Sequence, residues 1–159
     1  LWGRNVVRHH SVQYGLNRGF DVGFTAGGEH EGVGVTGVYA AEFTREGIFN
    51  ALREGRTFGT TGDRIVVDFR LDRTPMGGRL QTAAPAVNGT LSVLGTDLIT
   101  AVRIVCNGRT VRECQPDALN VTLDWEEARP AGDRAYYYAV IAQRNEEMAW
   151  SSPVFVYGP

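Results

Sequence analysis

With 159 residues, of which 43% are hydrophobic and 21% charged, the chain can bury the core of one domain or two small ones, and extensive disorder is excluded. The 16 basic and 18 acidic residues give a formal net charge of −2, and no basic stripe is present, so we expect no nucleic acid as a partner. No apolar run approaches the roughly 18 residues that span a bilayer, so we expect no membrane insertion.

The first forty residues mix helical and extended patterns. Ser11 is a good N-cap for a short helix that Gly19 would end. The alternation over 20–25 predicts a short strand, which leads into a glycine-rich loop at 26–37. The apolar stretch 38–40 is a candidate second strand.

The clearest helix is predicted over residues 45–54. Thr44 is its expected N-cap and Gly55 its C-terminal stop. Phe43 and Ile48 are spaced for a hydrophobic staple across the cap. One face of this helix carries three apolar side chains at spacings of three and four: Ile48, Phe49 and Leu52.

After residue 62 the pattern is nearly all β. Seven segments have strand character: 65–71, 87–94, 99–106, 110–114, 119–125, 135–143 and 154–157. Turn signals separate them about every ten residues, which is typical of an antiparallel immunoglobulin-like β-sandwich. The predicted fold class is therefore mainly β with an α/β lead-in.

The two cysteines flank the strongest hairpin signal of the chain, Asn107-Gly108. A two-residue turn places Cys106 opposite Arg109 and Cys114 opposite Ala101. Because side chains alternate between the faces of a sheet, this register points the two thiols to opposite faces. We therefore predict two free cysteines.

The glycine-rich loop carries a candidate metal site. His30 lies between Glu29 and Glu31, and imidazole with carboxylates is the ligand chemistry of Zn, Mn or Fe sites. One His and two Glu are too few for a closed site, so a bound metal would need ligands from elsewhere. The alternative is a polar surface loop.

A candidate anion site lies near residue 60. Thr60 and Thr61 offer hydroxyls and Arg64 offers a guanidinium, which together could hold an anion. The alternative is a hydrogen-bonded turn that leads into the first strand of the β-rich part.

Several motifs in the first half resemble one family. The similar segments are Ser11-Val12-Gln13, Arg18-Gly19-Phe20, Glu42-Phe43-Thr44-Arg45-Glu46, Phe49-Asn50-Ala51-Leu52-Arg53, Arg56-Thr57-Phe58 and Thr60-Thr61-Gly62-Asp63-Arg64-Ile65. They resemble the end of a PHP-type (polymerase and histidinol phosphatase) metal-dependent phosphoesterase. The resemblance is strongest to a poorly characterised bacterial group whose barrel carries a β-rich C-terminal extension.

This resemblance implies two parts, the last elements of a PHP-like barrel over residues 1–60 and a β-sandwich domain over 61–159. It implies a parent protein that hydrolyses a phosphoester of an unknown small molecule with divalent metal ions (Mn, Zn or Fe). His30 would be a metal ligand there, with Glu29 and Glu31 as further candidates. The partner of this chain would be the rest of the parent barrel.

Because the remaining ligands would lie upstream of Leu1, we expect the chain alone to be an inactive part of a bacterial hydrolase. The alternative is a non-catalytic module in which Tyr136–Tyr138 or Trp125 bind carbohydrate or a partner protein. A third reading is purely structural, in which the sandwich supports the barrel and shapes an oligomer. The compartment stays open between cytoplasm and export.

Overall fold

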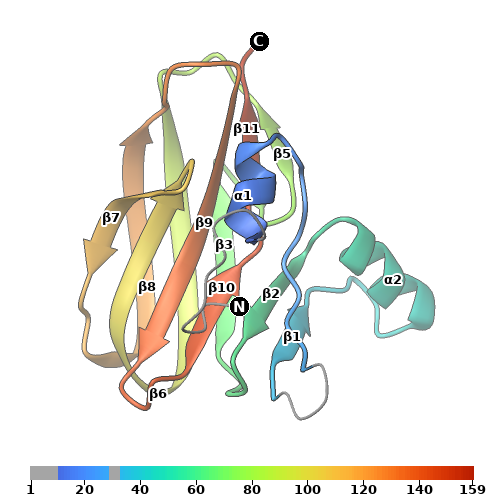
Figure 1. The fold of residues 1–159 in the computed structure, drawn as a ribbon, viewed down its shortest axis with the longest axis vertical. Helices are drawn as coiled ribbons and strands as arrows, with labels where there is room; N and C mark the ends of the chain where they lie inside the picture. Colours follow the sequence, from blue (N-terminus) through green and yellow to red (C-terminus); the bar gives the residue numbers. More distant parts are fainter. Residues whose placement is uncertain (1–10, 29–32) are drawn as a thin grey trace.

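The computed structural model describes residues 11–28 and 33–159, in which eleven strands form one curled sheet and two short helices lie beside it (Figure 1). The helices are α1 (Val12–Asn17) and α2 (Arg45–Arg53). The strands are β1 (Val35–Val38), β2 (Thr57–Thr60), β3 (Val66–Leu71), β4 (Thr74–Pro75), β5 (Arg79–Gln81), β6 (Ala86–Cys106), β7 (Arg109–Cys114), β8 (Ala118–Ala128), β9 (Arg134–Gln143), β10 (Met148–Ser151) and β11 (Val154–Tyr157).

The long strand β6 organises the sheet. Its first half, up to Leu94, is paired with β3 and β8, whereas its second half, from Ile99, is paired with β9 and β7. The register shifts between Leu94 and Ile99, where the ladder is irregular. A bulge of this kind bends a strand and increases its twist, so the two halves of the sheet curl towards each other.

The main core lies between these two halves. Val67, Phe69 and Leu91 from one half and Ile104 and Tyr137 from the other belong to one buried apolar cluster. The strand β9 is buried over nearly its whole length, which explains its continuous apolar and aromatic run.

A second, smaller cluster covers the outer face of β9. Leu16 of α1 packs there with Tyr136, Tyr138 and Phe155. The ring of Phe24 meets that of Tyr138 edge to face, with centroids 5.3 Å apart. The lead-in is therefore attached to the sheet by apolar packing as well as by polar contacts.

The mainly β fold with a short α/β lead-in is confirmed, but the immunoglobulin-like sandwich of two separate sheets is not what the strand pairing shows. The segments 87–94 and 99–106 are one strand of 21 residues, and all strands belong to one sheet. Gly95 and the polar residues after it gave the signal of a turn, although the chain only bends there. The strand β2 also joins this sheet, since it pairs with β10 next to the predicted boundary at residue 60.

Both predicted helices are confirmed. Ser11 accepts a hydrogen bond from the Tyr14 amide, and Thr44 accepts one from the Gly47 amide. The strand predicted over 20–25 is wrong, since these residues are outside the sheet ladder. The hydrophobic staple is wrong as well, because Phe43 is 98% exposed.

The hairpin at Asn107-Gly108 is confirmed, and both cysteines are free as predicted. The predicted register of the two cysteines, however, is wrong. A bulge shifts the register so that Cys114 lies opposite Val102 instead of Ala101. Val102 and Cys106 are on the same face, so the thiols are not on opposite faces. They are about four residues apart along the ladder, roughly 13 Å, which is too far for a disulfide.

Candidate functional site

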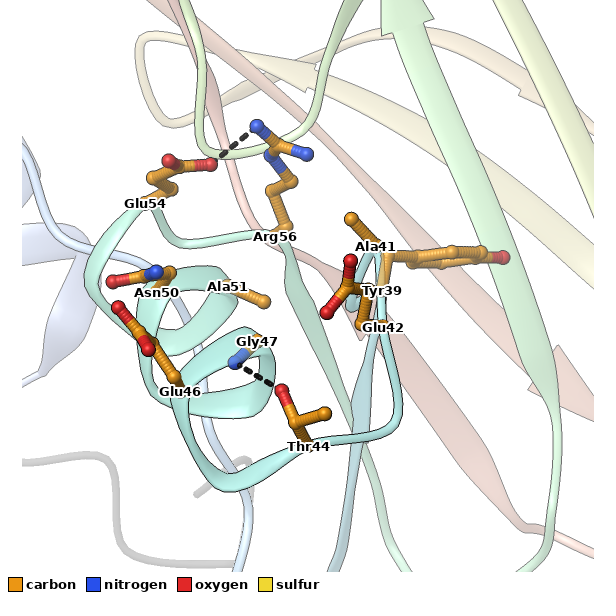
Figure 2. Close-up of a pocket in the computed structure, with 10 residues that line it drawn as sticks. All are labelled: Tyr39, Ala41, Glu42, Thr44, Glu46, Gly47, Asn50, Ala51, Glu54 and Arg56. Carbon is orange, nitrogen blue, oxygen red and sulfur yellow. Dashed lines mark hydrogen bonds and ion pairs between the residues drawn. The ribbon is translucent and has the colours of Figure 1, made fainter.

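An open hollow of about 350 Å³ lies between α2 and the segment that follows β1 (Figure 2). It is lined by Tyr39, Ala41, Glu42, Thr44, Glu46, Gly47, Asn50, Ala51, Glu54 and Arg56. The helix forms one wall, and Tyr39 and Glu42 stand on the opposite side. The hollow exists because α2 contacts the rest of the chain only lightly, with Ala51 as its one buried residue.

The charged groups of this hollow are partly neutralised within the chain. Arg56 forms an ion pair with Glu54. A second hollow of about 270 Å³ shares Tyr39 and Arg56 with the first and adds Asp68 and Arg70. In the second hollow, the Arg70 guanidinium donates to both carboxylate oxygens of Asp68, with Nη2 and Oδ2 2.9 Å apart. Exposed ion pairs of this kind add little stability.

Tyr39 connects the two hollows. Its ring centroid is 5.9 Å from that of Phe58, whose ring lies across Gly37, where an added Cβ would be 2.0 Å from the ring. Burial raises the pKa of the Tyr39 hydroxyl, and the negative charge of Asp68 raises it further. The hydroxyl is therefore a neutral hydrogen-bonding group near neutral pH.

Three exposed apolar side chains lie on α2 or just before it, outside the lining of the first hollow. Phe43 is 98% exposed, Phe49 58% and Leu52 42%, so most of the apolar face of α2 points to solvent. The guanidinium of Arg53 lies over the Phe49 ring, 5.9 Å from its centroid. We call Phe43, Phe49 and Leu52 the α2 patch. An exposed apolar group of this kind is typical of a contact surface for another protein.

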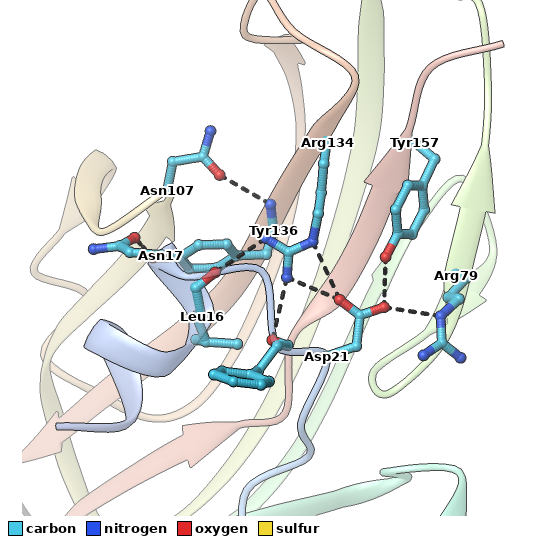
Figure 3. Close-up of polar contacts among 9 residues, drawn as sticks. Leu16, Asn17, Asp21, Arg79, Asn107, Arg134, Tyr136 and Tyr157 are labelled. Atoms are coloured by element: carbon cyan, nitrogen blue, oxygen red, sulfur yellow. Dashed lines mark hydrogen bonds and ion pairs between the residues drawn. The ribbon is translucent and has the colours of Figure 1, made fainter. Parts of the chain in front are cut away.

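A polar cluster around Asp21 fixes the lead-in to the sheet (Figure 3). The Asp21 carboxylate accepts from Arg134 Nη2 at 2.8 Å, from Arg79 Nε at 2.9 Å and from the Tyr157 hydroxyl at 2.5 Å. Arg134 also donates to the main-chain oxygens of Leu16 and Phe20. One carboxylate thus joins the lead-in to β5, β9 and β11.

Burial alone would raise the pKa of Asp21, but hydrogen bonds from Tyr157, Arg134 and Arg79 together outweigh burial and lower it. Burial alone would lower the pKa of Arg134, but its hydrogen bond to Asp21 and the negative charge of that carboxylate help to raise it. Both groups are therefore charged near neutral pH. With all its oxygens occupied by the chain's own donors, Asp21 serves attachment rather than catalysis.

The residues of the predicted metal site, Glu29, His30 and Glu31, lie outside the described residues. Within the described part, no three His, Cys, Asp or Glu side chains gather as they would to hold a metal ion. The metal site and the activity of a longer parent protein therefore stay predictions.

The residues of the predicted anion site do not converge. The Thr60 hydroxyl is buried without a hydrogen-bond partner among the described residues. The Thr61 hydroxyl is bonded to the carboxylate of Glu147, whereas Arg64 is exposed. The hydroxyl of Thr61 is therefore used within the chain, in contacts with Glu147 and Met148.

The aromatic residues considered for carbohydrate stacking are buried. Tyr136, Tyr137 and Tyr138 are at most 1% exposed, and Trp125 packs in the main core. Trp125 lies over Gly89, where an added Cβ would come within 2.1 Å of the indole. Burial raises the pKa of Tyr136 to about 12, in line with its place in the smaller cluster. None of these rings is available to stack on a sugar.

Sequence reasoning did not find the Asp21 cluster. Its one local signal is a carboxylate inside the apolar alternation of 20–24, which a solvent-facing strand position explains equally well. Arg79, Arg134 and Tyr157 are more than fifty residues away along the chain, so only the fold brings them together.

Comparison with known proteins finds similarity to proteins without an assigned function. A family described as "Protein of unknown function (DUF3604)" matches residues 10–87. An uncharacterized protein of Chlamydia muridarum is 30% identical over 172 residues, which cover 89% of this chain and 28% of that protein. A protein of Chlamydia pneumoniae is 30% identical, with 92% and 28% covered. The chain thus spans about 28% of the length of these curated relatives.

The resemblance to PHP-type phosphoesterases is wrong. The family that matches residues 10–87 is the family of unknown function, and the relatives that match nearly the whole chain carry no PHP description. Short motifs such as 42–46 and 60–65 suggested the resemblance, but they include helix-capping and turn residues that many folds share.

Among solved structures, a crystal structure of an engineered protein matches with 18% identity and a TM-score of 0.35 and covers 60% of this chain and 20% of that one. Among the described residues, neither helix is long and apolar enough to cross a membrane.

Proposed function

We propose that this chain is a non-catalytic β module that packs, through the α2 patch, against another folded part of a longer polypeptide. The observation that carries the proposal is the distribution of exposed apolar side chains. Nine of the thirteen large ones among the described residues lie between Val12 and Leu52, so the apolar surface is concentrated on the lead-in.

The α2 patch has the chemistry of a contact surface between proteins. Aromatic side chains are enriched in such contacts, and Phe43 and Phe49 are the most exposed phenylalanines near the hollow. The neighbouring charges of Arg56 and Glu54 neutralise each other. An apolar surface whose neighbouring charges are partly neutralised favours a protein partner over a charged small molecule.

The length of the relatives supports a partner within the same polypeptide. In the Chlamydia muridarum protein, the matching region is 28% of the whole, so most of that protein lies outside it. A domain in the same chain is present at a high effective concentration, so a modest apolar contact is enough to keep the two parts together.

Hydrogen exchange in that relative tests the proposal. The whole protein and its matching region alone would be compared at the amides aligned with α2 of this chain. We expect slower exchange at these amides in the whole protein, and equal exchange in both at amides aligned with the core strand β9, which serves as the control. Equal exchange at the α2 amides in both samples would contradict docking through this surface.

A further inference from the structure

The strand β1 ends the sheet on one side. In the strand order it has one neighbour, β2, with which it pairs antiparallel from Val35 opposite Thr60 to Val38 opposite Thr57. In the described part of the chain, no main-chain hydrogen bond outside this ladder involves residues 35–38. The outer side of β1 is therefore an open edge.

The register of β1 against β2 identifies which main-chain amides and carbonyls of β1 face away from β2. The Tyr39 amide donates to the Arg56 carbonyl at 2.9 Å, just beyond the ladder, so Tyr39 and the residues two and four before it face β2. The amide and carbonyl groups of Thr36 and Val38 consequently point away from the sheet. Within the described residues, the preceding segment contacts β1 through a side chain, since the amide and the carbonyl of Ala26 both bond to the Thr36 hydroxyl.

Three of the usual protections of an edge strand are absent from this segment, although β1 is short, with 4 residues. Residues 33–41 contain no charged residue and no proline, and the pairing of β1 with β2 has no bulge. Natural sheets normally use charges, prolines or bulges to keep an open edge from pairing with another chain. Val33 and Val35 are exposed here, which adds apolar surface along the edge.

We propose that the edge of β1 pairs antiparallel with β1 of a second copy of this chain. A two-fold contact places the same segment opposite itself, and a segment without charge brings no like charges together when it does so. With Thr36 of the two copies opposite each other, the outward amides and carbonyls of Thr36 and Val38 supply the hydrogen bonds of the added ladder, and the two Val35 side chains lie diagonally on the same face. The surface is distinct from the α2 patch, so the proposal does not depend on the proposed function.

A charge-swap experiment with the full chain tests this pairing. Sedimentation velocity over a range of concentrations would be measured for the wild type, for Val35→Arg, for Val35→Glu and for an equal mixture of the two variants. Val35 is 40% exposed, so the charged side chains can reach solvent in the monomer. We expect a wild-type dimer, at least a tenfold (~1.4 kcal/mol) weaker association for each variant alone, and recovery in the mixture.

Val66→Arg is the matched control, since Val66 is 38% exposed but lies on β3. It should leave the dimer unchanged. A wild-type chain that stays monomeric at every concentration would overturn the proposal. So would a dimer that Val35→Arg leaves intact, including one that Phe49→Ser abolishes, which would place the contact on the α2 patch instead. Failure of the mixture to recover would likewise exclude a two-fold β1 contact.

Discussion

The first part of the lead-in (residues 11–28) and the curled sheet (β1 to β11) are held in place by different kinds of interaction. In the sheet, strands are joined by main-chain ladders and bury a common core, as Phe69 and Tyr137 illustrate. In the lead-in, the extended segment after α1 is attached by side chains, for example through Asp21 and through the Ser152 hydroxyl, which accepts from the Phe24 amide at 2.7 Å.

This difference indicates where the molecule is self-sufficient. A main-chain ladder with a buried core stabilises itself, whereas a segment attached by a few side-chain hydrogen bonds and a small apolar cluster depends on each of these contacts. The lead-in also carries most of the exposed apolar side chains. We infer that the sheet is the stable body of the chain and that the lead-in is the part whose surface is completed by a partner.

The largest effect is expected from a change in the core of the sheet. Phe69 is fully buried and stacks on Trp125, with ring centroids 6.0 Å apart. Phe69→Ala should lower the free energy of unfolding by about 3–5 kcal/mol, through lost burial and the cavity left behind. Urea unfolding followed by tryptophan fluorescence measures this loss. Val66→Ala, on the exposed side of the same strand, should cost far less, and a similar cost for both would contradict the assignment of the core face.

An intermediate effect is expected at the attachment of the lead-in. Asp21→Asn removes the charge that Arg134 and Arg79 share and should cost about 2 kcal/mol, since hydrogen bonds to charged groups are worth roughly 1.5–3 kcal/mol. Hydrogen exchange should show the loss mainly in α1. Asp68→Asn, which breaks an exposed pair with Arg70, should change stability by less than about 0.5 kcal/mol.

The pH dependence of this variant sharpens the same test. Because the pKa of Asp21 is lowered by folding, the folded state binds the proton less readily than the unfolded state. The stabilisation is present in full above the ordinary aspartate pKa of about 4 and is lost as the pH falls through the folded value. The difference in unfolding free energy between wild type and Asp21→Asn should therefore be constant from neutral pH to about pH 5 and shrink below pH 4. A difference that persists undiminished at pH 2 would mean that the charge of Asp21 contributes nothing.

The elements that local chemistry determines were predictable from the sequence. Ser11 and Thr44 cap their helices as expected, and Asn107-Gly108 forms its turn, because each signal acts within a few residues. The strand over 20–25 was predicted wrongly, since alternation describes which side chains face inward but does not supply a neighbouring strand. The continuity of β6 was missed for a related reason, because a bend and a turn use similar residues at Gly95.

The candidate sites were less predictable, since they depend on long-range placement. Arg134 meets Asp21 from 113 residues away, and no local pattern announces that contact. The bulge between β6 and β7 shows the same limit, since one extra residue moved Cys114 to the face opposite to the one the turn alone implies. The exposure of Phe49 could not be predicted from the helical spacing of the apolar residues either. Such spacing predicts an apolar face that packs against the core, as in most isolated domains.

The smallest effect is expected on the α2 patch. Phe49→Ser removes a ring that is 58% exposed, so it should change the free energy of unfolding by no more than about 0.5 kcal/mol, as most surface substitutions do. Ala51→Gly is the control on the same helix, since Ala51 is its buried residue and glycine in a helix interior costs about 1 kcal/mol relative to alanine. Thermal and urea unfolding of both variants separate the two sides of α2. A loss above about 1 kcal/mol for Phe49→Ser would mean that the ring packs against the chain itself, and the α2 patch would then be part of the body rather than a surface left for a partner.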